Sequence, residues 1–112
     1  MAKVEIAEEL RNEIFKKFKE HSHKIFNLLY SLKENPKKGK TLGQVSGIVI
    51  KELKHEGFRF YFITDGYKLR VLSLEKLTDL VIRFVRMSDK KSQQKTIEEI
   101  KSILRKLGEQ GF

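Results

Sequence analysis

The sequence predicts an α+β fold, in which an N-terminal helical hairpin packs on one face of a mostly antiparallel sheet of about four strands and a further helix ends the chain. Three observations lead to this prediction. Two amphipathic segments lie between residues 8 and 35, strand-like runs follow one another from residue 48 to residue 87, and a helical stripe lies between residues 97 and 107. The chain has 112 residues, enough for one modest core, so we expect a single domain over residues 1–112.

The composition indicates the surroundings in which this domain works. The sequence has no cysteine, which argues against a disulfide scaffold or a thiolate metal site and suits a reducing compartment. No apolar run is as long as a membrane span, and the N-terminus lacks the apolar stretch of a signal peptide. We therefore expect a cytoplasmic protein with no metal, no cofactor and no membrane partner.

The charge of the chain narrows the class of partner. Its 24 Lys and Arg residues outnumber its 15 Asp and Glu residues, which gives a formal net charge of +9. A charge of this size on so small a domain favours a polyanion or an acidic protein as the partner. A lysine-rich surface that only keeps the protein soluble would give the same count.

The N-terminal third of the chain reads as two helices. Residues 3–6 alternate as a short edge strand does, although the approach to a helix would look the same. An amphipathic helix runs from about Glu8 to near His21, and Ser22 is a candidate N-cap for the second helix. That helix ends at Asn35-Pro36, because proline pushes the preceding residue out of the α region. The apolar positions are Leu10, Ile14, Phe15 and Phe18 in the first helix and Ile25, Leu28, Leu29 and Leu32 in the second.

A basic loop and a strand follow the helices. Residues 36–47 contain three lysines and three glycines, so we expect an exposed loop there. Its Lys-Lys-Gly-Lys run can bind phosphates, but such runs are more often solvated. Residues 48–54 are apolar enough for a strand, and residues 55–57 turn the chain. The length of that turn leaves the register open, so Lys51 can lie on either face of the sheet.

Residues 58–73 are predicted to form a β-hairpin around Asp65-Gly66. Asp-Gly between β-branched and aromatic residues favours a two-residue turn with positive φ at both positions. Side chains alternate between the faces of a strand, so one face of the hairpin is core. That face consists of Phe58, Phe60, Phe62, Tyr67, Leu69 and Val71. The other face carries Arg59, Tyr61, Lys68 and Arg70, and it is the candidate functional surface.

The last third of the chain is predicted to contain a connector, a strand and a helix. Residues 74–79 form the connector, and residues 80–87 are apolar enough for a strand inside the sheet. The final helix has apolar residues at heptad spacing, and Gly108 is placed to end it. The apolar residues of this helix are Ile97, Ile100, Leu104 and Leu107.

Three segments, in this order and spacing, resemble the RelE and ParE toxin superfamily over nearly the whole chain. They are Asn35 to Leu42 before the sheet, Gly57 to Phe62 within it, and Val85-Arg86-Met87 at the end of a strand. The resemblance implies a small toxin of a toxin–antitoxin pair. RelE-like members cut messenger RNA on the ribosome, ParE-like members poison DNA gyrase, and an antitoxin peptide, here expected to have an acidic segment, neutralises both kinds.

The resemblance also implies roles for individual residues. Arg59 falls on the strand arginine that RelE-like nucleases use against the scissile phosphate, and Arg86 and Lys90 complete the implied catalytic set. Lys90 keeps the charge of the family's usual arginine without its planar fork. Gln94 stands at the place of the family's tyrosine. The implied RNA-binding residues are Lys54, Tyr61, Lys68, Arg70 and Lys91.

Two other positions depart from the family pattern. Ile50 and Glu52 stand where RelE-like enzymes carry lysines, and Lys54 lies just beyond them. RNA cleavage by the 2′-hydroxyl needs a proton acceptor, cations around the phosphate and assistance to the leaving oxygen, and it needs no metal. Tyr61 can stack on a base or donate a proton, although a cation–π pair between Tyr61 and Arg70 would explain both residues without a function.

Two functions of different class remain open. The first is an RNA-cleaving toxin that acts through the basic sheet face. The second is a non-catalytic binder on the same fold, either a gyrase-directed inhibitor or a degenerate toxin that serves as a binding module.

Overall fold

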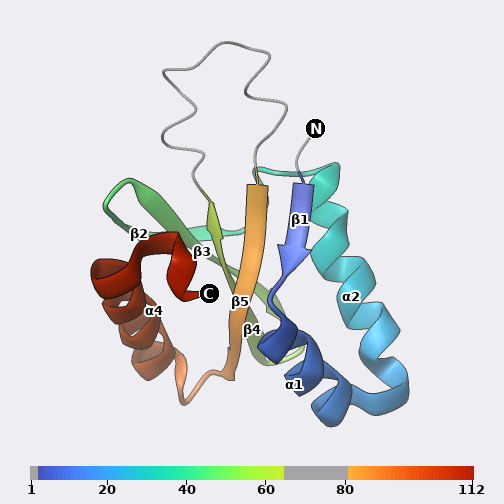
Figure 1. The fold of residues 1–112 in the computed structure, drawn as a ribbon. Helices are drawn as coiled ribbons and strands as arrows, with labels where there is room; N and C mark the ends of the chain where they lie inside the picture. Colours follow the sequence, from blue (N-terminus) through green and yellow to red (C-terminus); the bar gives the residue numbers. More distant parts are fainter. Residues whose placement is uncertain (1–2, 65–80) are drawn as a thin grey trace.

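The fold is α+β, as predicted, and the computed structural model describes residues 3–64 and 81–112 (Figure 1). Three short 3-10 turns, η1 (Lys19–His21), η2 (Ser31–Lys33) and η4 (Gly108–Gly111), extend the helices. Residues 65–80, which include Lys68, Arg70 and the expected connector, lie outside the described residues. The predicted hairpin pairing of residues 58–64 with residues 67–73 is wrong, because residues 58–64 pair with residues 49–55 on one side and with residues 82–89 on the other. The main elements are β1 (Lys3–Ile6), α1 (Glu8–Phe18), α2 (Ser22–Tyr30), β2 (Lys40–Val45), β3 (Ile48–His55), β4 (Phe58–Thr64), β5 (Val81–Asp89) and α4 (Gln93–Leu107).

The described part of the chain forms a five-stranded sheet with the order β1-β5-β4-β3-β2. Strand β1 pairs with β5 in parallel, and the other neighbours are antiparallel. The expected N-terminal strand is therefore present, and β5 lies inside the sheet as predicted. The prediction of an exposed loop over residues 36–47 is wrong for residues 40–45, which form the edge strand β2. The edge of β3 explains this difference, because its backbone groups need hydrogen-bond partners whatever the composition of the neighbouring segment.

Two-residue turns set the register of β2, β3 and β4. Val45 pairs with Ile48 and His55 pairs with Phe58, so each turn contains two residues. Both residues of each turn have positive φ, at 51° and 83° in the first turn and 48° and 84° in the second, which is the type I′ geometry that suits the twist of a hairpin. Lys51 consequently pairs with Phe62 and lies on the face that α1 and α2 cover. This settles the face of Lys51, which the sequence left open.

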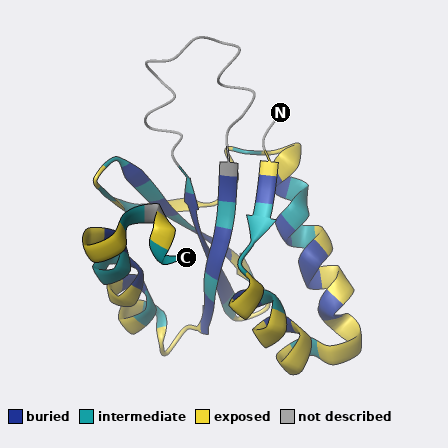
Figure 2. Cartoon of the chain, viewed as in Figure 1, coloured by how far each residue is buried: buried dark blue, intermediate teal, exposed yellow. Residues whose placement is uncertain are grey.

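Helices α1 and α2 cover one face of the sheet (Figures 1 and 2). Phe60 and Phe62 on β4 are fully buried in this layer, and Phe58 packs against its margin. The ring of Phe18 meets that of Phe58 edge-on at 5.3 Å between centroids. The predicted phenylalanine face of residues 58–62 is therefore confirmed as core.

Helix α4 covers the opposite face. Its residues Ile97, Ile100 and Leu104 are buried, as the heptad spacing predicts, and Gly108 ends the helix. Leu107 is 64% exposed, so its assignment to the apolar stripe is wrong. The sheet side of this second core consists of Ile48, Ile50, Tyr61, Ile63 and Val85. The sheet thus lies between α1 and α2 on one side and α4 on the other.

Ser22 has a different role from the predicted N-cap. It is the first residue of α2, it is buried, and its hydroxyl donates a hydrogen bond to the carbonyl oxygen of Ile14 at 3.2 Å. Lys19, with φ of 49°, interrupts the helical conformation between α1 and α2. The serine hydroxyl therefore ties α2 back to α1 and does not satisfy an amide of its own helix.

Replacing Phe60 with alanine is expected to lower the free energy of unfolding by about 3–5 kcal/mol, because the change leaves a cavity in a fully buried site. Urea denaturation would measure this change. Phe15→Ala is the matched control, since the Phe15 side chain is 51% exposed and its loss should cost about 1 kcal/mol or less. Equal effects of the two changes would contradict this description of the core.

Candidate functional site

A group of polar side chains lies on the sheet face under α4. Glu52 on β3 pairs with Tyr61 on β4, and Arg59 on β4 pairs with Ser88 on β5. Residues directly opposite each other in antiparallel strands share a face, and Gln93, the first residue of α4, joins them from above. We call these five residues, Glu52, Arg59, Tyr61, Ser88 and Gln93, the polar cluster.

Hydrogen bonds organise part of the polar cluster. The hydroxyl oxygens of Tyr61 and Ser88 are 2.8 Å apart, and Ser88 donates its one proton to the carbonyl oxygen of Asp89 at 2.9 Å. Tyr61 is therefore the donor to Ser88. The side-chain amide of Gln93 donates to Oε2 of Glu52 at 2.9 Å. These two bonds fix the phenol of Tyr61 and the first turn of α4 relative to the sheet.

Two charged groups of the cluster are buried and incompletely paired. The exposed fraction of Glu52 is 1% and that of Arg59 is 8%. Oε1 of Glu52 and Nε of Arg59 have no hydrogen-bond partner within the described residues. The exposed Lys54 lies near Glu52, with its Nζ 4.0 Å from Oε1. A buried polar group without a partner costs about 1–3 kcal/mol, and more when it is charged, so these two groups require an explanation such as a catalytic role or a bound water or ion.

The hydroxyl of Tyr61 is held in its neutral form. Burial raises the pKa of Tyr61 above its ordinary value of 10.0, the hydrogen bond with Ser88 lowers it, and the negative charge of Glu52 raises it further. The phenol of Tyr61 is therefore protonated at neutral pH and remains the donor to Ser88.

Stability is expected to fall as the pH rises above about 10, partly because of Tyr61. The pKa of the Tyr61 hydroxyl is higher in the folded than in the unfolded chain. As the pH rises, the unfolded chain therefore loses the hydroxyl proton first, and this deprotonation favours unfolding. Below pH 10 the contribution is fully present. Urea denaturation of wild type and Tyr61→Phe at pH 8 and above pH 10 would measure this. An alkaline loss of equal size in both proteins would contradict the assignment to Tyr61.

Arg86 lies next to the cluster, but its guanidinium contacts α4 and the C-terminal residue. A β-bulge in β5 lets Tyr61 pair with Arg86 while Phe62 pairs with Phe84, so Val85 is the extra residue. The guanidinium of Arg86 donates from Nε to Glu99 on α4 at 2.8 Å. It also lies over the ring of Phe112, 5.2 Å from the centroid. The structure therefore places Arg86, which was predicted to be catalytic, in a contact between β5 and α4.

The other predicted site residues surround one end of the cluster. Lys54 pairs with Arg59 across the β3–β4 ladder and is exposed. Lys90 and Lys91 are exposed in the short connection between β5 and α4. Because Phe58 pairs with Asp89, that connection lies at the same end of the sheet as the β3–β4 turn. Lys54, Lys90 and Lys91 therefore form a basic rim at the end of the sheet where Arg59 lies.

The prediction that Arg59 and Tyr61 lie on a solvent-exposed face is wrong. Tyr61 is fully buried, so it cannot stack on an RNA base in this conformation. The physical reason is α4, whose apolar stripe needs a sheet face to cover it. Ile50 and Ile63 provide that apolar surface beside the charged residues. The predicted RNA-binding residue Tyr61 is therefore part of the second core.

The residue of α4 that reaches the cluster is Gln93, not Gln94. Gln94 is exposed, and its side-chain amide is bonded to Glu98 at 3.4 Å. A tyrosine at position 94 would therefore not lie over the sheet. Glu52, Ser88 and Gln93 had no predicted functional role. For Glu52 a signal was available, because a carboxylate inside an apolar strand is costly unless it has a partner.

No group of residues that could hold a metal ion is found in the described part of the chain. None of its helices is long and apolar enough to cross a membrane. Comparison with family models, with curated proteins and with solved structures gives no match.

Proposed function

We propose that this chain is a RelE-like toxin of a toxin–antitoxin pair that binds RNA at the basic rim and cleaves it with groups of the polar cluster. The observation that carries the proposal is Arg59, a guanidinium that is 8% exposed and has no ion pair within the described residues. A buried cation of this kind is stabilised when an anion such as a phosphate comes beside it. The resemblance of the sequence to RelE and ParE toxins supports the same assignment of Arg59.

The cluster supplies groups suited to metal-independent RNA cleavage. Glu52 is only 1% exposed and lies under Gln93, so RNA reaches it only when the first turn of α4 moves aside. In that open state its carboxylate is the candidate acceptor of the 2′-hydroxyl proton, since its Oε1 has no other hydrogen bond within the described residues. The 2′-oxygen then attacks the phosphorus, the bond to the 5′-oxygen breaks, a 2′,3′-cyclic phosphate forms, and the leaving 5′-oxygen takes a proton from water. Arg59 stabilises the negative charge that develops on the phosphate, which is commonly the largest single contribution. Tyr61 positions β5 through Ser88 and takes no proton.

The basic rim suits both expected partners. Exposed lysines bind RNA phosphates by releasing counterions, and Lys54, Lys90 and Lys91 provide them beside Arg59. The ribosome is the place where RelE-like toxins meet messenger RNA. An acidic segment of an antitoxin would block the same lysines by charge complementarity.

Two assays of the wild-type protein test this proposal. Induced expression is expected to arrest growth, and a translating extract that receives the purified protein is expected to accumulate messenger RNA fragments. The fragments should end in a 2′,3′-cyclic phosphate. A wild-type protein that neither arrests growth nor cuts RNA would contradict the nuclease assignment.

A second candidate function is a non-catalytic binder on the same fold, either gyrase-directed or acting as a binding module. This candidate is favoured because α4 covers the sheet face: Tyr61 is buried, and Gln94 points outward. This candidate predicts that the protein binds RNA or gyrase without cutting RNA. An assay in which gyrase supercoils relaxed DNA distinguishes the two targets, because only a gyrase-directed protein would inhibit it.

A further inference from the structure

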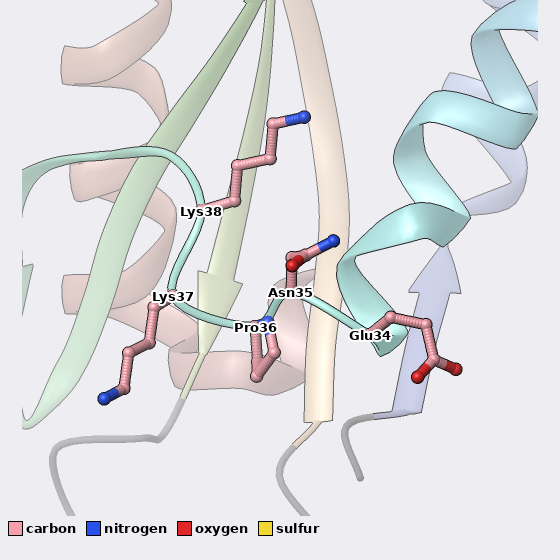
Figure 3. A pocket seen from close by; sticks show the side chains of 5 residues that line it. All are labelled: Glu34, Asn35, Pro36, Lys37 and Lys38. Atoms are coloured by element: carbon pink, nitrogen blue, oxygen red, sulfur yellow. The ribbon is translucent and has the colours of Figure 1, made fainter.

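A second basic surface lies on the other side of β3, away from the polar cluster. The segment between η2 and β2 bends around a pocket lined by Glu34 to Lys38 (Figure 3). Figure 3 shows Lys37 and Lys38 leaving opposite sides of this segment, while the carboxylate of Glu34 points away from both. We call the surface formed by Asn35, Lys37, Lys38 and Lys51 the basic platform.

The lysines of the basic platform have no carboxylate partner within residues 3–64 and 81–112. Lys37 and Lys38 are exposed. Their positive charge is therefore available to a partner, and it is spread over the width of the loop and not directed at one point.

The platform is held in place by contacts with the sheet. Gly39 has φ of 103°, and a Cβ at this position would lie 2.9 Å from the ring of Phe62 and 3.0 Å from the carbonyl oxygen of Glu52. Only glycine allows the loop to approach the sheet this closely. The backbone amide of Lys38 also donates to the carbonyl oxygen of Asn35 at 3.1 Å, which closes a turn. The loop is therefore a preformed surface.

Lys51 adds a cation at the base of the platform. Its ammonium donates to the carbonyl oxygen of Lys37 at 3.3 Å and lies 5.8 Å from the ring centroid of Phe62. Partial burial lowers the pKa of Lys51, as expected for a cation that has lost water without gaining a carboxylate. An anion bound over the loop would compensate for this loss.

We propose that the basic platform binds the phosphate backbone of the RNA, as a second contact surface besides the basic rim. This inference rests on the proposed function. Several separated cations match a chain of phosphates better than a single phosphate, and backbone phosphates are bound through such cations without base readout. The platform offers no large apolar side chain, whereas the centre of a protein–protein interface needs one. RNA is therefore favoured over an acidic protein.

Fluorescence anisotropy with a 20-nucleotide single-stranded RNA, measured between 50 and 200 mM salt, tests the inference. The double variant Lys37→Gln/Lys38→Gln should bind more weakly at low salt. Its plot of log affinity against log salt should be less steep by about 1.4, because each lost phosphate contact on single strands contributes about 0.7. The matched control, Lys16→Gln/Lys24→Gln, removes two exposed lysines from α1 and α2 and should keep the slope of the wild type.

The outcomes separate this inference from the proposed function. Equal slopes for the platform variant and the control, in a wild-type protein that binds and cuts RNA, would overturn the inference alone. Poly-glutamate binding that is lost in the platform variant while RNA binding persists would overturn it in favour of an acidic polypeptide. A wild-type protein that does not bind RNA would overturn the proposed function and this inference together.

Discussion

Arg59→Ala is expected to lower the rate of RNA cleavage by about a hundredfold or more. Arg59 is the one buried cation of the polar cluster, and removal of a single donor that stabilises transition-state charge costs about two to three orders of magnitude. Thermal stability is measured alongside, because Arg59 is buried and its truncation removes packing under α4 as well as charge. The measurement is single-turnover cleavage of messenger RNA in a translating extract, together with growth after induction.

Two control variants make the Arg59 experiment specific. Arg105→Ala removes the same charge from the exposed side of α4 and should cleave RNA at the wild-type rate. Gln94→Tyr restores the residue type that the family resemblance implies. It should nevertheless leave the rate unchanged, because Gln94 points away from the sheet. Similar rates for Arg59→Ala and Arg105→Ala would show that Arg59 has no special role.

Glu52→Gln is expected to lower the cleavage rate by about two to four orders of magnitude, which is the contribution of a positioned group that transfers a proton. Glutamine has nearly the same shape as glutamate, and its carbonyl oxygen can accept the hydrogen bond that Gln93 now donates to Oε2. The loss should therefore appear in the rate while α4 stays in place. Single-turnover cleavage at saturating protein measures this loss.

Binding provides the test that separates chemistry from structure at Glu52. The variant should bind RNA at least as tightly as the wild type, since it removes a negative charge beside Lys54. A loss of cleavage with unchanged binding and unchanged thermal stability would support the proton-acceptor role. If Glu52→Gln cleaves RNA at the wild-type rate, Glu52 has no role in the mechanism. The chemistry must then be assigned to Arg59.

The periodicity of the sequence determined which residues form helices, strands and core. Phe58, Phe60 and Phe62 alternate with Arg59 and Tyr61, which was enough to predict the phenylalanine face as core. The same reasoning predicted that α4 docks through Ile97, Ile100 and Leu104, because these positions recur at helical spacing. Such patterns are local, so they can be found without knowledge of the partners of each element.

Pairing between distant segments determined what the sequence left undecided. Residues 40–45 became β2 because β3 offered an edge to pair with, although their composition is that of a loop. Tyr61 became buried because α4, some thirty residues later in the chain, covers its face. No local pattern contains that information.

The candidate site, too, could be predicted from the sequence only in part. Arg59 could be proposed from the sequence because it stands at a motif position on a strand. Glu52, Ser88 and Gln93 come from three further elements, and only the strand registers and the docking of α4 bring them together. The sequence therefore determined the elements and one arginine of the site, while the tertiary structure decided the cluster around it, because polar groups acquire partners only when the sheet and its covering helix are assembled.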